Sequence, residues 1–311
     1  MLCNSPIEFI DTLYNNNIYI KREDKLPFSF GGNKVRFAKA FLEDMHQKGK
    51  NAIIAYGSKS SNLCRVMAQM CFDNKIPCAV VYSGNEEENT YNSKIVSSLS
   101  VREYACDKTS VAQTVQRAID DFNKDGFDPY YIYGNTKGEG NELTPVNSYK
   151  PVFDEIKKYE TNNNKTFDYI FLATGTAATY SGLLIRASEL ESDTKIIGIS
   201  VARDKEKCTS VIKNNLDSYF GTSKIADINI TDEYLFSGYG KTCAEELKVI
   251  DFIYDNFNIP LDPTYTGKAF YGMKEYLNKN DINNKNILFI HTGGYPLFCD
   301  YKGLPLQGET I

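Results

Sequence analysis

The chain has 311 residues, enough for one large domain or two lobes, and its 42% hydrophobic and 24% charged residues are ordinary for a soluble globular protein with a substantial core. The formal net charge is −5 with acids and bases interspersed, so the chain lacks the basic stripe that nucleic acid phosphates require. The apolar runs are only strand-sized, and no basic segment followed by an apolar one opens the chain, so neither a membrane span nor a secretion signal is expected.

Cysteine and histidine usage points to a cytoplasmic protein without a metal. The chain has eight cysteines, none in C-x-x-C spacing, and only two histidines, His46 and His291. A zinc site would therefore need an unusual ligand set, and no metal is expected. Several cysteines lie inside apolar segments, which indicates free, mostly buried thiols in a reducing cytoplasm.

Short apolar runs alternate with longer amphipathic stretches along the chain. In the first half, runs rich in β-branched and aromatic residues predict strands at Ala52–Tyr56, Cys78–Tyr82, Val101–Tyr104 and Tyr130–Tyr133, with helices at Val35–Gln47, Asn62–Asp73 and Val111–Lys124. In the second half, strands are predicted at Tyr169–Thr174, Lys195–Val201 and Ile287–His291, with helices at Val152–Tyr159, Ala178–Leu190 and Glu245–Phe257. Such alternation requires crossover connections, which are typical of parallel sheets with helices on both faces.

Two polar segments interrupt this alternation. The turn-rich stretch Gly134–Glu142 predicts a long loop, and the run Thr161–Lys165 is expected to lack regular structure. The predicted fold class is α/β, in two lobes with twisted, mainly parallel sheets flanked by helices. In such sheets ligands bind beyond the carboxyl ends of the strands, so the loops that follow strands are the places to expect chemical groups.

The first such loop leads to Lys34. The run Phe30-Gly31-Gly32-Asn33-Lys34 places two glycines, which allow a sharp turn, before a lysine that opens a helix. The positive end of the helix dipole disfavours the charged form of an amine there and lowers its pKa. A partly neutral amine can attack an aldehyde and form a Schiff base, although an ordinary solvated lysine would fit the same pattern.

The second loop, Gly57-Ser58-Lys59-Ser60-Ser61-Asn62, runs from a strand end into a helix. Ser61 and Asn62 lie where backbone N–H groups have no intrahelical partner, so this loop could bind a carboxylate. A plain helix N-cap with a polar lead-in is the alternative.

The third loop, from Ala173 to Leu183, passes from a buried strand through small and hydroxyl residues into an apolar helix. Several N–H groups and threonine hydroxyls can converge on one phosphate in that arrangement. The segment is neither a P-loop nor a dinucleotide fingerprint, because it lacks the following lysine and the G-x-G-x-x-G spacing. We interpret it as a phosphate site.

Two further segments place hydroxyl groups at turns near strand ends. They are Asp262-Pro263-Thr264-Tyr265-Thr266-Gly267-Lys268 and His291-Thr292-Gly293-Gly294. Alone, each would be an unremarkable loop.

Together the five segments resemble the fold-type II pyridoxal 5′-phosphate (PLP) enzymes, specifically the D-cysteine desulfhydrase and 1-aminocyclopropane-1-carboxylate (ACC) deaminase family. They occur in the order that this family uses, and the resemblance spans the chain from about Ile18 to Leu297. It implies a large PLP-binding domain formed by residues 1–36 and 149–311 and a small domain formed by residues 37–148. It also implies a homodimer that acts on a small amino acid.

The resemblance assigns roles to individual residues. Lys34 would be the Schiff-base lysine, and Asn62 would contact the phenolic oxygen of the cofactor. The catalytic set on the substrate side would comprise Ser61, Tyr239 and Tyr265 beside Lys34. The remaining cofactor-binding residues would be Gly175, Thr176, Ala177, Ala178 and Thr179 around the phosphate, together with Thr266 and with Thr292 at the pyridine nitrogen.

Four positions depart from the pattern of the family. Ser60 and Leu63 stand where the family has glutamine and histidine on either side of Ser-Asn. Ala177 and Ala178 replace two glycines of the phosphate loop, and their methyl groups disfavour positive φ angles.

The resemblance implies β-elimination, most readily from a D-cysteine-like substrate, giving pyruvate, ammonia and sulfide. A neutral Thr292 hydroxyl at the ring nitrogen makes the cofactor a weaker electron sink, which favours loss of a β-substituent over transamination. Thr266 stands where ACC deaminases carry glutamate, which argues against ring opening. The alternatives are a β-replacement synthase, an ACC deaminase, or a non-catalytic PLP or small-molecule binding protein.

Overall fold

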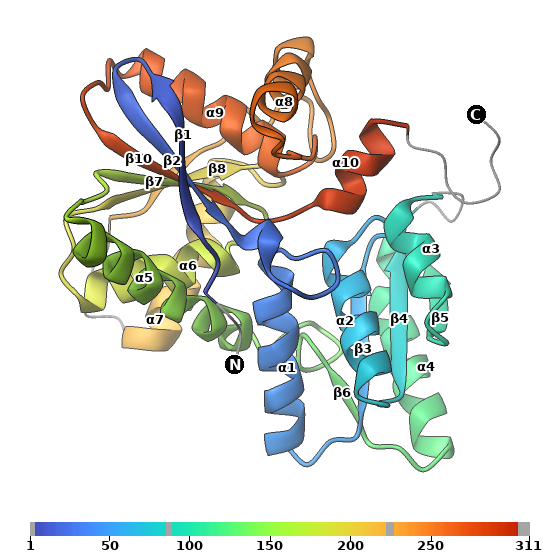
Figure 1. Cartoon of the computed structure of the whole chain (residues 1–311). Helices are drawn as coiled ribbons and strands as arrows, with labels where there is room; N and C mark the ends of the chain where they lie inside the picture. The colour runs from blue at the N-terminus through green and yellow to red at the C-terminus, as the bar shows by residue number, and fades with distance from the viewer. Residues whose placement is uncertain (1–3, 85–88, 222–226, 304–311) are drawn as a thin grey trace. The chain divides into compact units, whose positions relative to one another are not determined.

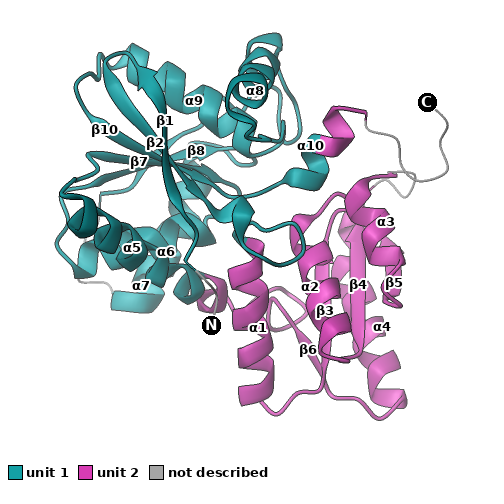
Figure 2. Cartoon of the chain, viewed as in Figure 1, with its two compact units in different colours: residues 1–33, 146–298 teal, residues 34–145, 299–311 magenta. Residues whose placement is uncertain are grey.

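The computed structural model describes residues 4–84, 89–221 and 227–303, and the chain divides into two compact units (Figure 2). Unit 1 comprises residues 1–33 and 146–298, and unit 2 comprises residues 34–145 and 299–311. The sequence placed the boundaries at 36 and 148, three residues later in each case, and kept the C-terminal segment with the large domain. In the structure, Asp300 accepts a hydrogen bond from the backbone N–H of Tyr91 at 3.0 Å, which ties this segment to unit 2. The outermost residues of the expected large domain, 1–3 and 304–311, lie outside the described residues.

Within the described residues, unit 1 is built on a six-stranded sheet. Its strand order is β1 (Ile7–Leu13), β2 (Asn16–Arg22), β10 (Asn286–His291), β7 (Tyr169–Thr174), β8 (Lys195–Ser200) and β9 (Asn229–Thr231). Only the edge pair β1–β2 is antiparallel among these strands, and the other neighbours are parallel. The central strands are buried on both faces, as their continuous apolar runs predict.

Helices cover both faces of this sheet (Figure 1). On one face lie α5 (Leu143–Asn163), α6 (Ala178–Glu189) and α7 (Lys205–Phe220); on the other lie α8 (Ala244–Phe257) and α9 (Thr266–Lys279). The Tyr180 hydroxyl of α6 donates to the Ile196 carbonyl of β8 at 3.1 Å. On the opposite face, Phe270 of α9 packs edge-on against Phe289 of β10, with ring centroids 5.1 Å apart. The predicted arrangement of helices on both faces is confirmed.

Unit 2 has a four-stranded parallel sheet within the described residues, in the order β5 (Arg102–Cys106), β4 (Cys78–Ser83), β3 (Ala52–Gly57) and β6 (Pro129–Tyr131). Its helices are α1 (Lys34–Gln47), α2 (Asn62–Asp73), α3 (Tyr91–Ser97) and α4 (Val111–Lys124). Short 3₁₀ turns occupy Glu23–Lys25 in unit 1 and Lys108–Ser110 in unit 2, and α10 covers Tyr295–Tyr301. One core layer joins Ile54 and Val81 of the sheet to Val115 and Phe122 of α4.

The predicted strands and helices are present, with one correction and several additions. Helix α5 runs through Pro151 and ends at Asn163, so Thr161–Asn163 are helical and not irregular as expected. Its buried face, which includes Tyr149, Val152 and Ile156, continues across the proline, and this packing outweighs the lost N–H donor. Strands β1, β2 and β9 and helices α3, α7, α9 and α10 were not predicted. No helix among the described residues is long and apolar enough to cross a membrane.

Candidate active site

The carboxyl ends of four parallel strands of unit 1 lie at one edge of its sheet. Arg22 of β2 pairs with His291 of β10, and Thr174 of β7 pairs with Ser200 of β8. The loops that follow these strands therefore leave from the same edge. They carry the glycine pair before Lys34, the predicted phosphate loop and Thr292.

Gly32, before Lys34, and Gly293, after β10, permit a close approach between two of these loops. Gly32 has φ +96°, and a Cβ there would lie 2.8 Å from the carbonyl oxygen of Thr292. Gly293 has φ +99°, and a Cβ there would lie 2.6 Å from the Cα of Gly32. The backbone N–H of Asn33 donates to the Thr292 carbonyl at 3.0 Å. Glycine is thus required at these positions for backbone contact as well as for φ.

The buried side chain of Asn33 joins this segment to the predicted phosphate loop. Its Nδ2 donates to the Thr179 hydroxyl oxygen at 2.9 Å. The oxygen of Thr179 therefore acts as an acceptor on the Asn33 side, so its own hydrogen is available to donate elsewhere. The sequence identified Asn33 only as part of a motif, and its role as a bridge needed the tertiary structure.

Lys34 is the first residue of α1, immediately after Asn33. Its ammonium nitrogen lies 4.4 Å from the centroid of the Phe37 ring. Burial lowers the pKa of this amine to about 8. The direction is the one predicted from the sequence, and the cause is desolvation of the amine.

The predicted phosphate loop begins directly after β7. Ala177 is the N-cap residue of α6 and has φ +70°, the left-handed conformation, without a side-chain cap among the described residues. The first N–H groups of α6 are therefore not occupied by a capping side chain and can bind an anion. Arg203, which the sequence did not single out, holds the loop by donating to the Gly175 carbonyl at 3.1 Å.

The predicted substrate-side tyrosines are brought together in unit 1. The hydroxyl groups of Tyr239 and Tyr265 are 2.5 Å apart, close enough to share a proton. The carboxylate of Asp262 accepts the backbone N–H groups of Thr264 and Tyr265 at 2.9 and 2.8 Å, which fixes the turn that carries Tyr265. Burial raises the pKa of Asp262, while these hydrogen bonds favour its ionised form.

Thr266 lies on the inner side of the same turn and is fully buried. Its hydroxyl donates to Asp262 at 2.8 Å and accepts the Asp262 N–H at 2.8 Å. This geometry favours a role in shaping the turn over the direct cofactor contact expected from the sequence.

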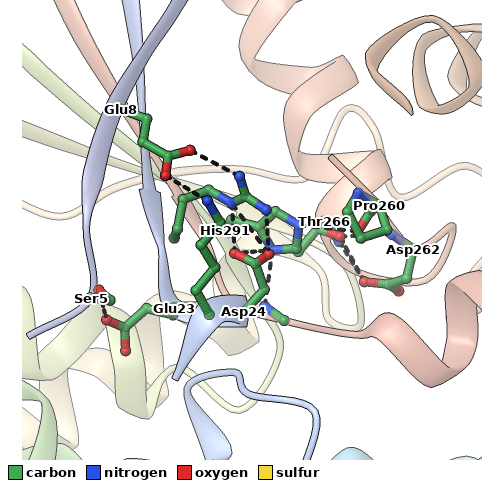
Figure 3. A network of polar contacts seen from close by, with 11 residues as sticks. Ser5, Glu8, Glu23, Asp24, Pro260, Asp262, Thr266 and His291 are labelled. Atoms are coloured by element: carbon green, nitrogen blue, oxygen red, sulfur yellow. Dashed lines mark hydrogen bonds and ion pairs between the residues drawn. The ribbon is translucent and has the colours of Figure 1, made fainter. Parts of the chain in front are cut away.

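His291 connects several of these segments and was not assigned a role from the sequence. The N–H of Gly293 donates to its Nδ1 at 3.2 Å, so the proton is on Nε2, which lies 3.0 Å from the Pro260 carbonyl. Asp24 lies 3.7 Å from Nδ1 (Figure 3). The Asp24 carboxylate in turn forms an ion pair with Arg22. Thr292, partly exposed, lies between two anchored neighbours.

In unit 2, the loop after β3 carries Ser61 and Asn62. Ser61 is the N-cap of α2 and accepts the Cys64 N–H at 3.2 Å, as expected for a capping serine. Asn62 is the first helical residue, and its Oδ1 accepts from Asn92 at 3.1 Å. Leu63, which replaces the histidine of the family, is 8% exposed and packs inside unit 2.

Comparison with known proteins identifies the family to which the chain belongs. The model of the family described as pyridoxal-phosphate dependent enzyme matches residues 3–293. The chain is 30% identical over 312 residues to a D-cysteine desulfhydrase from Yersinia enterocolitica, covering 96% of this chain and 93% of the relative. It is 26% identical over 308 residues to a putative ACC deaminase from Pyrococcus abyssi, covering 96% and 91%. A solved structure described as an ACC deaminase homologue superposes with TM-score 0.83 at 28% identity, covering 97% and 92%.

The protein belongs to the pyridoxal-phosphate-dependent enzyme family. Within it, the chain is a lyase of the ACC deaminase and D-cysteine desulfhydrase type with the fold of the fold-type II enzymes.

The described residues fit the cofactor that this family uses. The start of α6 and the free hydrogen of Thr179 supply donors for a phosphate. Lys34 supplies an amine with a lowered pKa, which can react with an aldehyde.

Proposed function

We propose that this protein catalyses β-elimination from a small D-amino acid such as D-cysteine, consuming one water and releasing pyruvate, ammonia and sulfide. The observation that carries the proposal is the double anchoring of Asn33. Its backbone bonds to Thr292 and its side chain to Thr179, so the residue before Lys34 is tied to two segments assigned to the cofactor.

The proposed binding roles follow from the donors that each residue offers. When bound, PLP withdraws electrons from the Cα of the amino acid attached to it. The N–H groups from Gly175 to Thr179 and the Thr179 hydroxyl hold the phosphate, Asn62 donates to the phenolic oxygen, and Thr292 offers a neutral hydroxyl to the ring nitrogen.

The proposed proton transfers use three side chains. Lys34 takes the Cα proton, because its lowered pKa leaves a larger share of the amine neutral near pH 7. Tyr239 and Tyr265 share a short hydroxyl contact, so either can deliver a proton to the departing thiolate. Ser61 binds the substrate carboxylate at the start of α2.

A substrate panel tests the reaction. The purified protein with PLP is supplied with D-cysteine, L-cysteine, D-serine, β-chloro-D-alanine and ACC, and the 2-oxo acids are identified. We expect pyruvate from D-cysteine and β-chloro-D-alanine. α-Ketobutyrate from ACC as the main product would overturn the substrate assignment.

Opening of ACC is the second candidate reaction. Putative ACC deaminases are among the similar proteins at a comparable level of identity. Against it stands Thr266, which places a buried hydroxyl after Tyr265 where the resemblance expects a glutamate in ACC deaminases. A β-replacement synthase would instead show little release of pyruvate without an added nucleophile, and a carrier protein would take up PLP and turn over none of the substrates.

We also propose that the protein works as a homodimer in the cytoplasm. Phe9 on the edge strand β1 and Phe252 on α8 are each 54% exposed, and a second copy could cover such apolar surface. Light scattering coupled to size-exclusion chromatography measures the mass: about twice the 35.1 kDa of one chain supports the dimer, and a monomer contradicts it.

A further inference from the structure

Two buried polar side chains in unit 2, those of Asn92 and Arg65, face the amide of Asn62. Asn92 of α3 is fully buried. Arg65, which lies one turn after Asn62 on α2, is 1% exposed. Arg65 Nε donates to Asn92 Oδ1 at 2.7 Å. Asn92 Nδ2 donates to the Ser60 carbonyl at 2.7 Å and to Asn62 Oδ1 at 3.1 Å.

The chemistry of the partners determines which way each amide points. A guanidinium can only donate and a carbonyl can only accept. Asn92 must therefore turn its oxygen to Arg65 and its nitrogen to Ser60, and that nitrogen also faces Asn62. Asn62 must present its oxygen to Asn92, and Arg65 Nη2 lies 3.5 Å from the same oxygen. The Nδ2 of Asn62 is then the group left to donate, and it has no acceptor among the described residues.

The surrounding helix keeps Asn92 in place. Thr90 and Ser93 form a capping box at the start of α3, and the Thr90 hydroxyl donates to the Lys59 carbonyl at 3.3 Å. Burial lowers the pKa of Arg65 to about 10, so it is still a cation at neutral pH. Its charge faces the amide oxygens of Asn92 and Asn62, which strengthens their N–H groups as donors.

We propose that Asn92 and Arg65 are positioning residues that hold Asn62 as an obligatory hydrogen-bond donor to an anionic oxygen, the phenolate of PLP. The inference rests on the proposed function. A donor fixed in this way stabilises the phenolate, whereas an amide free to turn could present its oxygen and repel it.

The substitution Asn92→Asp tests this orientation. Aspartate has the size of asparagine and keeps an acceptor for Arg65, but it cannot donate to Asn62. Asn62 is then expected to turn its nitrogen to the new carboxylate and its oxygen outward. We expect PLP affinity to fall about ten-fold, the effect of losing a hydrogen bond to a charged group. The pH midpoint of the absorbance change of bound PLP should rise by about one unit, because the phenolate becomes more basic.

Asn141→Asp is the matched control. Asn141 is also a buried asparagine of unit 2, with its oxygen facing a cation, Lys48 Nζ at 2.6 Å, and its nitrogen facing a carbonyl, that of Tyr131 at 3.0 Å. Its hydrogen-bond partners are Lys48 and Tyr131 and not Asn62, so we expect the titration midpoint to stay at the wild-type value. In an Asn62→Ala background, Asn92→Asp should produce no further shift.

The outcomes separate the two proposals. If wild-type protein takes up no PLP, the proposed function fails. If wild-type protein binds PLP and Asn92→Asp lowers only the unfolding temperature, with affinity and midpoint unchanged, the positioning role is wrong. Should Asn92→Asp not fold, Arg65→Gln replaces it, since glutamine can donate or accept and no longer dictates the orientation of Asn92. The same direction of shift is expected, and an unchanged midpoint contradicts the proposal.

Discussion

Ala177 adopts a backbone conformation that residues with a Cβ rarely adopt, at the start of the helix proposed to bind phosphate. The sequence anticipated a conflict there, because alanine replaces a glycine of the family pattern. The structure shows that the loop keeps φ at +70°, so the strain is borne by Ala177 itself. The left-handed conformation costs an alanine about 1 kcal/mol relative to glycine.

Ala177→Gly should relieve this strain. We expect the free energy of unfolding to rise by about 1 kcal/mol, and PLP affinity to increase or stay the same. Ala178→Gly is the control, because Ala178 is a helical residue without positive φ and glycine there should destabilise by about 0.5–1 kcal/mol. Urea unfolding of both variants measures the difference. Equal effects of the two substitutions would contradict the account of the loop.

The lowered pKa of Lys34 predicts how PLP uptake depends on pH. Only the neutral amine attacks the aldehyde, and its fraction grows ten-fold per pH unit below the pKa. The rate of PLP uptake by the apoprotein should therefore rise with pH and level off above about 8. Stopped-flow absorbance measures this rate. A rise that continues to about pH 10.5 would show that burial does not perturb the lysine.

At the residue scale, the sequence singled out residues that lie in local motifs and did not single out residues that contact them from distant parts of the chain. Lys34, Thr179 and Asn62 belong to local motifs that can be read from a few neighbours. Asn92 and His291 act through partners far away in the chain, such as Asn62 and Asp24. Such partners depend on the packing of whole elements, and no local pattern contains them.

Helices α8 and α9 enclose a carboxyl group whose ionisation should couple to stability. Glu246 of α8 is fully buried, and neither carboxyl oxygen has a hydrogen-bond partner among the described residues. Burial raises its pKa from 4.5 to about 8, against the opposing attraction of Lys268 on α9. Between pH 4.5 and about 8, folding therefore takes up a proton at Glu246. The contribution of this protonation to the free energy of unfolding is complete below pH 4.5 and is lost as pH rises towards 8.

Glu246→Gln stays neutral at every pH and should escape this loss. Relative to wild type, its free energy of unfolding, measured in urea, should increase progressively from about pH 5 to pH 8. The increase should reach up to about 1.4 kcal/mol per pH unit. Glu245→Gln, at the exposed neighbour on the same helix, should show no such gain. A pH-independent difference for Glu246→Gln would mean that the carboxyl is ionised in the folded protein.

The contact between the loops after β2 and β10 makes a second prediction at the scale of elements. Gly32→Ala places a Cβ 2.8 Å from the Thr292 carbonyl, whereas Gly49→Ala, also at positive φ, has no atom within 4 Å of the new Cβ. Gly49→Ala should cost only the backbone strain, about 1 kcal/mol. Gly32→Ala should cost more stability and also weaken PLP binding, measured by absorbance titration. Unchanged PLP affinity in Gly32→Ala would argue against the role of this contact.

The elements themselves could be predicted where the apolar pattern was strong. The buried strands β3, β4, β7 and β10 were found from their apolar runs, whereas β1, with alternating partly exposed residues, was missed. Helix α7 was missed because only four of its sixteen residues are buried, a narrow stripe within a polar sequence. The length of α5 was underestimated: the predicted helix began at Val152, directly after Pro151, whereas α5 begins at Leu143 and runs through the proline.

At the scale of the molecule, the chain changes unit between Asn33 and Lys34. The two-lobed organisation was predicted from the chain length and from the alternation of strands and helices, and the boundaries implied by the resemblance differ from those of the two units by three residues. PLP that binds only the folded protein should stabilise it by about 2.7 kcal/mol at 100 times the dissociation constant. Thr179→Val removes a proposed phosphate donor and should weaken binding by about 1.5–3 kcal/mol. Thermal unfolding at several PLP concentrations measures the stabilisation of the wild type and of Thr179→Val. Identical shifts for the wild type and the variant would show that Thr179 does not bind the phosphate.

The central claim is that Lys34 is the residue that binds the cofactor covalently. The direct measurement is reduction of the PLP-loaded protein with borohydride, followed by peptide mass mapping of wild type and of Lys34→Ala. The account predicts a reduced PLP adduct on the peptide that contains Lys34 in the wild type and no specific adduct in the variant. An adduct on Lys59 or Lys268, or one that persists in Lys34→Ala, would contradict it.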